Sequence, residues 1–299
     1  MDILVAGGNG FIGTHLVPEL LADGHEVTVL ARTPEDGDLP DAVETVSGDI
    51  TAYDSIESAV AGQDAVVNLV ALSPLFKPKG GDRMHDEVHR HGTENLVRAA
   101  EAGGVDRFVQ LSALGADPDG ATAYIRAKGD AEEHVTDSDL DWVLIRPSVV
   151  FGEGGEFVSF TKKLKSMFAP GVPIYPLPGG GKTRFQPIHV GDLVGMLAET
   201  LIDDAHVGET YKFGGPDDLT LREITNMVYD SEGKSVSIVP VPMALAGVGL
   251  TLGGKVPGFP MGADQYRSLQ FDNTTADNGI GAFGVDEDGL TPLAGYLGV

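Results

Sequence analysis

The first 150 residues alternate short apolar runs with longer segments of helical periodicity. The runs are rich in Val, Ile and Leu, as buried strands are, and they fall at residues 3–6, 26–30, 43–46, 64–70, 107–112 and 142–145. In the intervals, apolar residues recur at helical spacing, which predicts helices at 12–21, 55–60, 93–102 and 123–135. Strands separated by helices indicate right-handed βαβ units, so we expect an α/β fold with a doubly wound, mostly parallel sheet.

The alternation fades after Phe151, where proline and glycine become frequent. A β-branched and aromatic run at 209–213 is expected to return the chain to the sheet. We therefore expect a first domain and a smaller C-terminal lobe. The first domain comprises residues 1–150 and about 185–215, and the lobe comprises residues 151–184 and 216–299.

Residues 235–254 carry no charge, and their length approaches that of a membrane-spanning helix. Pro240 and Pro242 interrupt the segment, and four glycines follow. We therefore expect a short buried or interfacial segment and no transmembrane helix.

The chain is strongly acidic. Its 299 residues include 45 Asp and Glu but only 20 Lys and Arg, which gives a formal net charge of −25. Such a field repels polyanions, so general nucleic-acid binding is excluded. Asp-rich loops and few lysines keep a surface hydrated in concentrated salt, and we expect a salt-loving source. The chain has no cysteine, which excludes disulfides, thiolate metal sites and cysteine catalysis. Because the first residues form a strand and lack a basic leader, we expect a cytoplasmic protein.

Three glycines, Gly7, Gly10 and Gly13, separate the first predicted strand from the first helix. In that position glycine permits a tight turn, close approach of backbone N–H groups to a pyrophosphate, and close packing of helix on strand. The helix N-terminus adds partial positive charge. The sequence therefore predicts a Rossmann-type dinucleotide site, with Phe11 and Ile12 among its contacts.

The end of the second strand distinguishes the two nicotinamide dinucleotides. NAD sites usually place a carboxylate there for the ribose 2′-hydroxyl, whereas an arginine suits the 2′-phosphate of NADP. This chain has Arg32, and its nearest acids, Glu35 and Asp36, lie beyond Pro34. We therefore expect NADP(H) in preference to NAD(H).

Two further strand ends complete the expected site. Asp49, followed by Ile50, would lie near an adenine amino group after the third strand. Val70 and Ala71, at the end of the fourth strand, would pass beneath the adenosine ribose.

Four motifs occur in the order found in the short-chain dehydrogenase/reductase superfamily, and the chain resembles its extended or atypical branch. They are Gly7-x-x-Gly10-x-x-Gly13, Gly48-Asp49, Tyr124-x-x-x-Lys128 and Arg146-Pro147-Ser148-Val149-Val150-Phe151-Gly152. Within that branch the chain is most similar to the group named for the large nucleotide-binding accessory subunit of respiratory complex I. Residues 110–116, 124–132 and 186–192 carry that similarity, which extends over nearly the whole chain.

The resemblance implies roles for three side chains. Tyr124 and Lys128 share one helix face, so Lys128 would hold the ribose hydroxyls of the cofactor while Tyr124 exchanges a proton with a carbonyl or alcohol. Ser112 would orient that carbonyl. A nearby ammonium is expected to lower the pKa of Tyr124 from its usual value of about 10.

Residues 146–152 would complete the cofactor site. The resemblance implies that Pro147, Val149 and Val150 close over the nicotinamide. His189 and Asp192 would organise the neighbouring loop and helix.

The chain departs from the family pattern at two places. Apolar Ala113 and Leu114 follow Ser112, and His89 replaces the helix asparagine of the family. Both departures match the complex I-like group, whose members bind NADP(H) with uncertain or no turnover. His85 and His91 do not make a metal site with His89, and no metal is expected.

We therefore expect an NADP(H)-dependent oxidoreductase on a small or hydrophobic carbonyl or alcohol of unknown identity, with the smaller lobe on the substrate side. Two alternatives stay open: a non-catalytic NADP(H)-binding subunit of a respiratory or quinone-linked complex, and a nucleotide-sugar epimerase or dehydratase. The first alternative would bring a peripheral membrane association. Arg32 and the short interval from Ser112 to Tyr124 weigh against the second.

Overall fold

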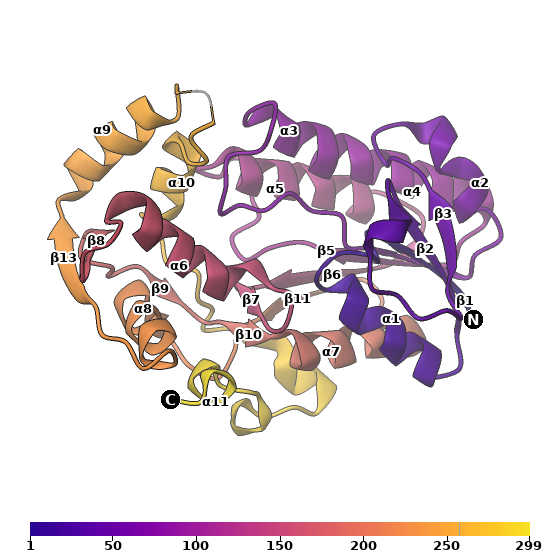
Figure 1. Cartoon of the computed structure of the whole chain (residues 1–299). Helices are drawn as coiled ribbons and strands as arrows, with labels where there is room; N and C mark the ends of the chain where they lie inside the picture. Colours follow the sequence, from indigo (N-terminus) through magenta and orange to yellow (C-terminus); the bar gives the residue numbers. More distant parts are fainter. Residues whose placement is uncertain (257) are drawn as a thin grey trace. The chain divides into compact units, whose positions relative to one another are not determined.

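The computed structural model describes residues 1–256 and 258–299, which divide into two compact units. Unit 1 comprises residues 1–72, 80–146 and 190–212, and unit 2 comprises residues 73–79, 147–189 and 213–299. Both units are therefore assembled from separate stretches of chain (Figure 1).

Unit 1 is built on a seven-stranded sheet of order β11-β6-β5-β4-β1-β2-β3. The strands are β1 (Asp2–Ala6), β2 (Glu26–Ala31), β3 (Glu44–Ser47), β4 (Ala65–Asn68), β5 (Arg107–Leu111), β6 (Asp141–Pro147) and β11 (Glu209–Phe213). All neighbours from β3 to β6 pair in parallel. The predicted doubly wound sheet, including the return of the chain at 209–213, is confirmed.

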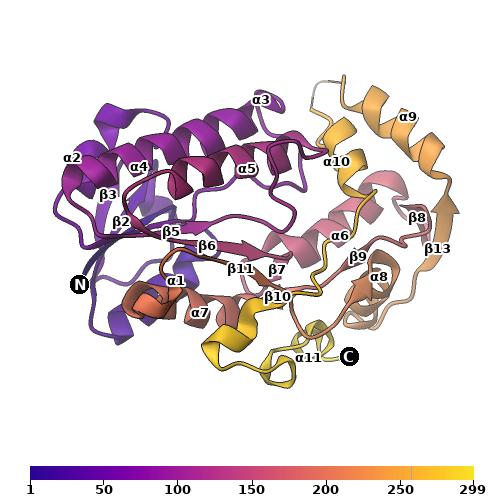
Figure 2. The ribbon, with the colours of Figure 1, turned by 180° about the vertical axis from the view of Figure 1, so that it is seen from behind.

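Helices cover both faces of this sheet. They are α1 (Gly13–Ala22), α2 (Glu57–Val60), α3 (Arg83–His85), α4 (Gly92–Gly103), α5 (Ala123–Thr136) and α7 (Val190–Ile202). Figures 1 and 2 show α1 and α7 on one face and α4 and α5 on the other. A π-helix at Asp86–His91 joins α3 to α4. The helix predicted at 55–60 is shorter, because a 3-10 turn at Tyr53–Ser55 precedes α2.

The strands of this sheet are apolar along their whole length because helices bury both faces of the sheet. In β1, Ile3, Leu4 and Val5 are fully buried, and all five residues of β5 are buried. Two polar members of β5 are bonded within the protein. Gln110 accepts a bond from Asn68 Nδ2 (2.9 Å), and Arg107 donates to Thr200 O (2.6 Å), although its Nε has no partner.

Unit 2 contains short sheets and helices. Its strands pair as β10 (Ile188–His189) with β7 (Val150–Phe151), β12 (Leu219–Thr220) with β9 (Arg184–Phe185), and β13 (Ser237–Val241) with β8 (Ile174–Pro178). Its helices are α6 (Glu156–Phe168), α8 (Leu221–Asp230), α9 (Met243–Gly253), α10 (Ala263–Ser268) and α11 (Leu293–Leu297). Helix α8 begins with a capping box between Thr220 and Glu223. One core of this unit gathers around Tyr175, Leu177 and Tyr229.

The uncharged segment 235–254 forms strand β13 and helix α9. Of the two expected placements, buried or interfacial, the buried one is wrong, because Leu245, Val248 and Leu252 are each about 60% exposed. The interfacial placement stays a prediction. Among residues 1–256 and 258–299, no helix has both the length and the apolar character that crossing a bilayer requires.

Candidate nucleotide and active site

The carboxyl ends of five parallel strands bring the predicted site residues to one edge of the sheet of unit 1. The strand order reverses between β1 and β4, which are paired neighbours. Open α/β sheets bind ligands at such a reversal, in the crevice outside the strand ends. Gly7 follows β1, Arg32 follows β2, Asp49 follows β3, Val70 follows β4 and Ser112 follows β5.

The glycine turn after β1 tolerates no side chain at three positions. Gly7 has φ +78°, and a Cβ there would lie 3.1 Å from the backbone nitrogen of Val70. A Cβ on Gly13 would lie 2.3 Å from the carbonyl oxygen of Gly8, and one on Gly8 would lie 2.7 Å from Val29 Cγ2. The turn therefore packs against the ends of β2 and β4. Gly8 was missed by the motif, although it stands directly beside Gly7 in the sequence.

Backbone donors are exposed at the start of α1. Gly10 N donates to Gly7 O (3.0 Å) and Thr14 N donates to Gly10 O (2.9 Å). Between them, the N–H groups of Phe11 and Ile12 find no acceptor within the described part of the chain. Unpaired donors at a helix N-terminus are the arrangement that accepts a pyrophosphate.

Arg32 lies where the sequence predicts it, immediately after β2. The side chain is exposed and forms no ion pair within residues 1–256 and 258–299. The glycine turn is tied to the next residue, because Asn9 Nδ2 donates to Thr33 O (2.9 Å). A free guanidinium beside the phosphate-binding turn can pair with a ribose phosphate.

Asp49 and Ile50 form a rigid corner after β3. Asp49 Oδ1 accepts bonds from both the backbone nitrogen (3.0 Å) and the hydroxyl (2.8 Å) of Thr51. The side chain of Ile50 is 5% exposed and belongs to the core, where it packs against Gly92. The other carboxylate oxygen of Asp49, Oδ2, could therefore accept a hydrogen bond from an adenine amino group. The buried side chain of Ile50 fixes the position of the turn.

The helix α5 positions Tyr124 and Lys128 one turn apart. Thr122 caps the helix by accepting a bond from Ile125 N (3.2 Å). Lys128 is 2% exposed, and its Nζ donates to Leu111 O (2.8 Å), the last carbonyl of β5. The next residue, Ser112, is buried, and its hydroxyl has no hydrogen-bond partner. A buried hydroxyl in this state is available to a ligand oxygen.

The expected lowering of the tyrosine pKa is wrong for the protein without a ligand. Burial raises the pKa of Tyr124 well above its usual value. Burial also lowers the pKa of Lys128 to about 8, against a smaller opposing effect of the Glu132 carboxylate. The ammonium of Lys128 is directed at Leu111 O and does not offset the cost of burying a tyrosinate. Tyr124 is therefore protonated at neutral pH.

Two histidines pack directly against Tyr124. The rings of His85 and His89 are stacked, with centroids 5.5 Å apart, and each meets the Tyr124 ring edge to face at 5.5 and 5.3 Å. Burial and the positive charge of Lys128 hold the pKa of His89 well below its usual value, so its ring is neutral. Leu72 N approaches His89 Nε2 (3.4 Å), which assigns the ring proton to Nδ1.

The Nδ1 of His89 is buried and has no hydrogen-bond partner. The site thus holds two buried donors without an acceptor, this nitrogen and the hydroxyl of Ser112. Sequence reasoning placed His89 at the family asparagine but missed its pairing with His85. The four-residue spacing of the two histidines was the available signal.

A family model described as NAD(P)H-binding matches residues 7–169, from the first glycine of the turn past the Tyr124 and Lys128 pair. The chain belongs to this family, as an atypical short-chain dehydrogenase/reductase. The superfamily predicted from the motifs is therefore confirmed, as is the Rossmann-type fold.

Named relatives of this short-chain dehydrogenase/reductase differ in their roles. NADH dehydrogenase (ubiquinone) 1 alpha subcomplex subunit 9 of Arabidopsis thaliana is 31% identical over 296 residues, which are 92% of this chain and 71% of the relative. A 3-beta-hydroxysteroid dehydrogenase of Mycolicibacterium neoaurum is 28% identical over 270 residues, or 80% and 72% of the two chains. The structure of dTDP-glucose 4,6-dehydratase from Streptomyces venezuelae, with NAD and TYD bound, has a TM-score of 0.67 and 26% identity, covering 81% of this chain and 84% of its own.

The family loop after β6 is anchored inside unit 2 of this short-chain dehydrogenase/reductase. Asn273 Oδ1 accepts bonds from the hydroxyl of Ser148 (2.8 Å) and from the backbone nitrogen of Val149 (3.1 Å). Val150 continues into β7, and Pro147 precedes the anchored pair. The role of Pro147, Val149 and Val150 at a nicotinamide stays a prediction. His189 packs against Phe151 with ring centroids 5.3 Å apart.

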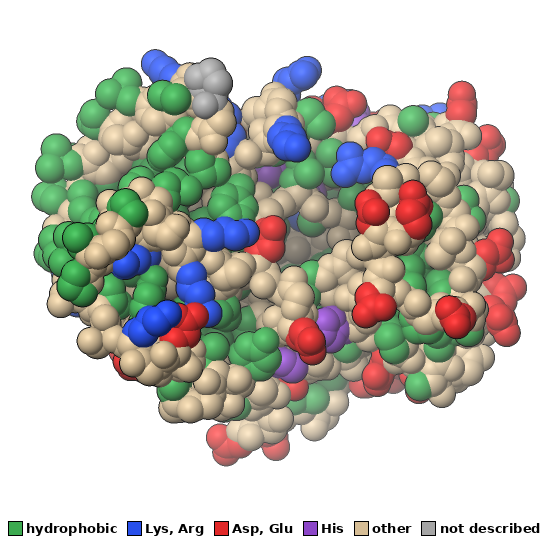
Figure 3. Space-filling view, in the orientation of Figure 1, with side chains coloured by type: hydrophobic (Ala, Val, Ile, Leu, Met, Phe, Trp, Pro, Cys, Tyr) green, Lys and Arg blue, Asp and Glu red, His purple; other side chains and the backbone are tan. Residues whose placement is uncertain are grey.

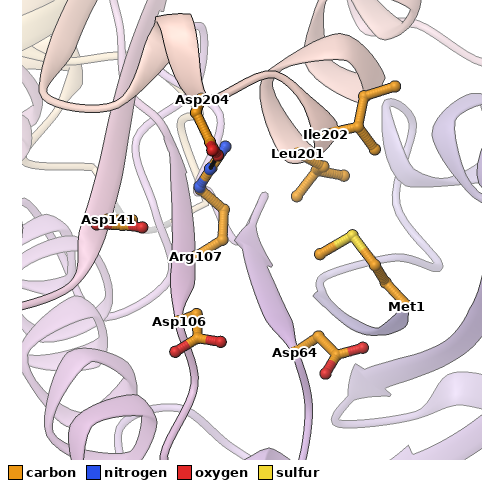
Figure 4. A pocket seen from close by; sticks show the side chains of 8 residues that line it. All are labelled: Met1, Asp64, Asp106, Arg107, Asp141, Leu201, Ile202 and Asp204. Atoms are coloured by element: carbon orange, nitrogen blue, oxygen red, sulfur yellow. Dashed lines mark hydrogen bonds and ion pairs between the residues drawn. The ribbon is translucent and has the colours of Figure 1, made fainter.

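A separate pocket lies at the opposite, amino edge of the sheet (Figure 4). It is lined by Met1, Asp64, Asp106, Arg107, Asp141, Leu201, Ile202 and Asp204. Arg107 ties β5 to α7 here, because its guanidinium donates to Thr200 O (2.6 Å) and pairs with Asp204 (2.7 Å). Carboxylates dominate the lining, so this pocket does not suit an anionic dinucleotide.

Within the described residues, one group has the geometry to hold a metal ion: Glu199, Asp203 and His206, at the end of α7. The Nδ1 of His206 already interacts with the hydroxyl of Tyr211 (2.8 Å). These residues lie outside the predicted site, and His85, His89 and His91 do not form such a group.

Proposed function

We propose that this short-chain dehydrogenase/reductase is an NADP(H)-dependent oxidoreductase that reduces a small or hydrophobic carbonyl or oxidises the corresponding alcohol. The observation that carries the proposal is a pair of buried donors without a hydrogen-bond partner: His89 Nδ1, whose ring packs against Tyr124, and Ser112 Oγ, directly after β5. A structural core would leave such donors satisfied.

A cofactor held at the N–H groups of Phe11 and Ile12 would, as NADPH, supply hydride to the carbonyl carbon in the reducing direction. Tyr124 is protonated and gives its proton to the carbonyl oxygen, so that the alcohol forms and the tyrosinate remains. Ser112 donates a hydrogen bond to the same oxygen as negative charge develops on it. Lys128 would hold the ribose hydroxyls of the cofactor, and a proton from solvent restores Tyr124.

Cofactor choice rests on Arg32. Its exposed, unpaired guanidinium after β2 supports pairing with the 2′-phosphate of NADP(H). The dinucleotide would lie on the N–H groups of Phe11 and Ile12 above the glycine turn, with Asp49 at the adenine and Val70 and Ala71 at the ribose.

The second candidate is a non-catalytic NADP(H)-binding subunit of a respiratory complex. It is favoured by 31% identity to a protein named as a complex I subunit. The missing hydroxyls at Ala113 and Leu114 also favour it. A nucleotide-sugar epimerase or dehydratase would instead retain NAD, which Arg32 does not suit.

Titration calorimetry of the full chain with NADPH and NADH tests cofactor choice. We expect Arg32→Ala to weaken NADPH binding about tenfold or more, since a charged hydrogen bond contributes about 1.5–3 kcal/mol, and to leave NADH binding unchanged. Arg83→Ala, which removes an exposed cation from the same unit, is the matched control. Tighter binding of NADH by the unmodified protein would contradict the assignment.

Turnover separates the two candidates. NADPH oxidation is followed against a panel of ketones, aldehydes and quinones. Tyr124→Phe should abolish turnover and retain NADPH binding. A protein that binds NADPH tightly and turns over none of the panel would favour the non-catalytic subunit.

A further inference from the structure

Unit 2 contains three stretches without a single Asp or Glu: residues 73–79, 157–189 and 233–263. These 71 residues carry nine Lys and Arg. Acids make up 45 of the 299 residues, so about eleven would be expected in 71 residues at that density. The absence of acids from these stretches is therefore a marked departure from the rest of the chain.

The charge of the chain is divided unevenly as a result. Unit 1 carries 32 Asp and Glu against 9 Lys and Arg, a formal charge of −23. Unit 2 carries 13 against 11, a formal charge of −2. An anionic partner would be repelled by unit 1 and not by the acid-free stretches of unit 2.

The same stretches expose large apolar side chains. Figure 3 shows apolar side chains gathered over α9, β8 and β13. We call this surface the apolar face. Its exposed members, each at least 42% exposed, are Phe168, Val172, Ile174, Val239, Leu245, Val248, Leu252 and Val256. Most exposed large apolar residues of the described chain therefore belong to one face, which is typical of an interaction site.

Helix α9 presents three large apolar residues outward. Leu245, Val248 and Leu252 follow one another at helical spacing and are 59–64% exposed. The buried side of the helix consists of Ala246, Gly247 and Leu250, and Gly247 permits close contact with the Tyr266 ring of α10. A surface helix of a globular protein normally turns its large apolar residues toward the core. Helix α9 is therefore built to offer an apolar stripe.

Lysines border the C-terminal end of this stripe. Lys77 Nζ donates to the carbonyl oxygen of Gly254 (2.8 Å), directly after α9. Lys163 lies over the ring of Phe76, 5.5 Å from its centroid. Lys255 is exposed and follows the helix immediately. Cations from three separate stretches of chain thus converge on the apolar face.

Some of these cations are not neutralised. Lys162 and Lys234 share the carboxylate of Glu232. In contrast, Lys163 and Lys255 form no ion pair within the described part of the chain. The border of the apolar face therefore keeps free positive charge on a strongly acidic protein.

We propose that the apolar face docks on the surface of a lipid bilayer that carries anionic headgroups. Such a surface matches both properties, because apolar side chains enter the boundary of the acyl chains while lysines pair with the headgroups. In concentrated salt the Debye length falls to about 3 Å, so the apolar stripe would carry most of the binding there. This docking is independent of the proposed oxidoreductase function.

Co-sedimentation of the full chain with vesicles tests the proposal. The probes are vesicles of phosphatidylcholine alone and of phosphatidylcholine with phosphatidylglycerol, each at low and at high KCl. We expect binding to the anionic vesicles. The triple substitution Leu245→Ser, Val248→Ser, Leu252→Ser should lower partitioning at least about tenfold at both salt concentrations.

Charge substitutions give a different salt dependence. Lys163→Gln with Lys255→Gln should weaken binding about fivefold per lysine at low KCl, and much less at high KCl. Ile202→Ser, which removes a residue 60% exposed on α7 of unit 1, is the matched control and should bind like the unmodified chain. An unchanged thermal unfolding curve shows that each variant is folded.

Two results would overturn the proposal. One is an unmodified chain that stays in the supernatant with both kinds of vesicle at both salt concentrations. The other is binding that the triple substitution leaves unchanged.

If light scattering instead shows a dimer that the triple substitution converts to a monomer, and vesicles are not bound, the apolar face is an interface between two copies and the lipid assignment is wrong. Val248→Glu, a single exposed change, provides a second test and should abolish binding to anionic vesicles.

Discussion

His89 and Tyr124 meet edge to face with ring centroids 5.3 Å apart, and the histidine donates its proton to nothing in the described protein. A buried donor without an acceptor costs about 1–3 kcal/mol. The protein therefore retains an unfavourable group beside the residue expected to transfer a proton, which is a cost that function explains and folding does not.

His89→Phe separates the effect of the unpaired N–H on stability from its effect on activity. The phenyl ring keeps the packing on His85 and Tyr124 and removes the unpaired N–H. It also removes the acceptor of the long bond from Leu72 N (3.4 Å), so we expect the free energy of unfolding to rise by at most about 1–3 kcal/mol. Loss of the donor should lower kcat/KM about a hundredfold. Urea unfolding and NADPH-coupled turnover measure the two quantities. His89→Asn, which restores a side-chain donor, should recover part of the activity. A variant that is neither stabilised nor slowed would show that the nitrogen has no such role.

Lys128 should make stability depend on pH. Burial lowers its pKa from 10.5 to about 8 in the folded protein. Between pH 8 and 10 the unfolded chain binds more protons than the folded one at this site, so the free energy of unfolding should rise with pH in this window. The largest gain that this pKa difference allows is about 3 kcal/mol.

Lys128→Met isolates this contribution. We expect the unmodified protein to gain stability relative to this variant between pH 8 and 10, in urea titrations at constant salt. Lys163→Met, which removes an exposed lysine, should follow the unmodified protein. Parallel curves for the unmodified protein and Lys128→Met would mean that the lysine is not desolvated.

Gly13→Ala tests the close packing of α1 on the turn. The new Cβ would lie 2.3 Å from the backbone of Gly8, and such overpacking costs about 1–3 kcal/mol. Because the turn must move, NADPH affinity should fall at least about tenfold. Gly195→Ala is the matched control: it lies exposed within α7 with open space around it and should stabilise the protein by up to about 1 kcal/mol. Equal melting temperatures for the two variants would contradict the packing argument.

Asn273 should control the loop after β6. Asn273→Leu leaves the backbone nitrogen of Val149 without its acceptor, at a cost of about 1–3 kcal/mol, whereas the hydroxyl of Ser148 can still donate to the backbone carbonyl of Asn273 (2.8 Å). Hydrogen exchange at Val149 should accelerate more than exchange in α8. Asn273→Asp keeps an acceptor oxygen and should retain the protection. Equal exchange rates in both variants would exclude the anchoring role.

The sheet and the glycine turn were predictable because both depend on local chemistry. Parallel strands covered on two faces need apolar runs, and the turn after β1 needs glycine where Gly7 meets Val70. The boundaries of the short helix α2 were less accurate, because a 3-10 turn at Tyr53–Ser55 takes up part of the expected segment.

The chemistry of the site was less predictable, because it depends on burial and on contacts between distant residues. The sign of the Tyr124 pKa change follows from desolvation, which outweighs a lysine whose ammonium is directed at Leu111 O. The anchoring of Ser148 by Asn273 joins residues 125 positions apart. No periodicity or local motif encodes such a pairing.

The placement of β11 and α7 affects how the protein is made. Residues 190–213 supply both β11, which pairs with β6, and α7, which packs against α1. Until these residues are made, β6 is the edge of the sheet. During synthesis, the first 150 residues therefore leave the ribosome with an open sheet edge and an uncovered helix, and unit 2 begins to emerge before unit 1 can close. A gene truncated near residue 150 should yield an aggregating fragment and no free-standing nucleotide-binding domain.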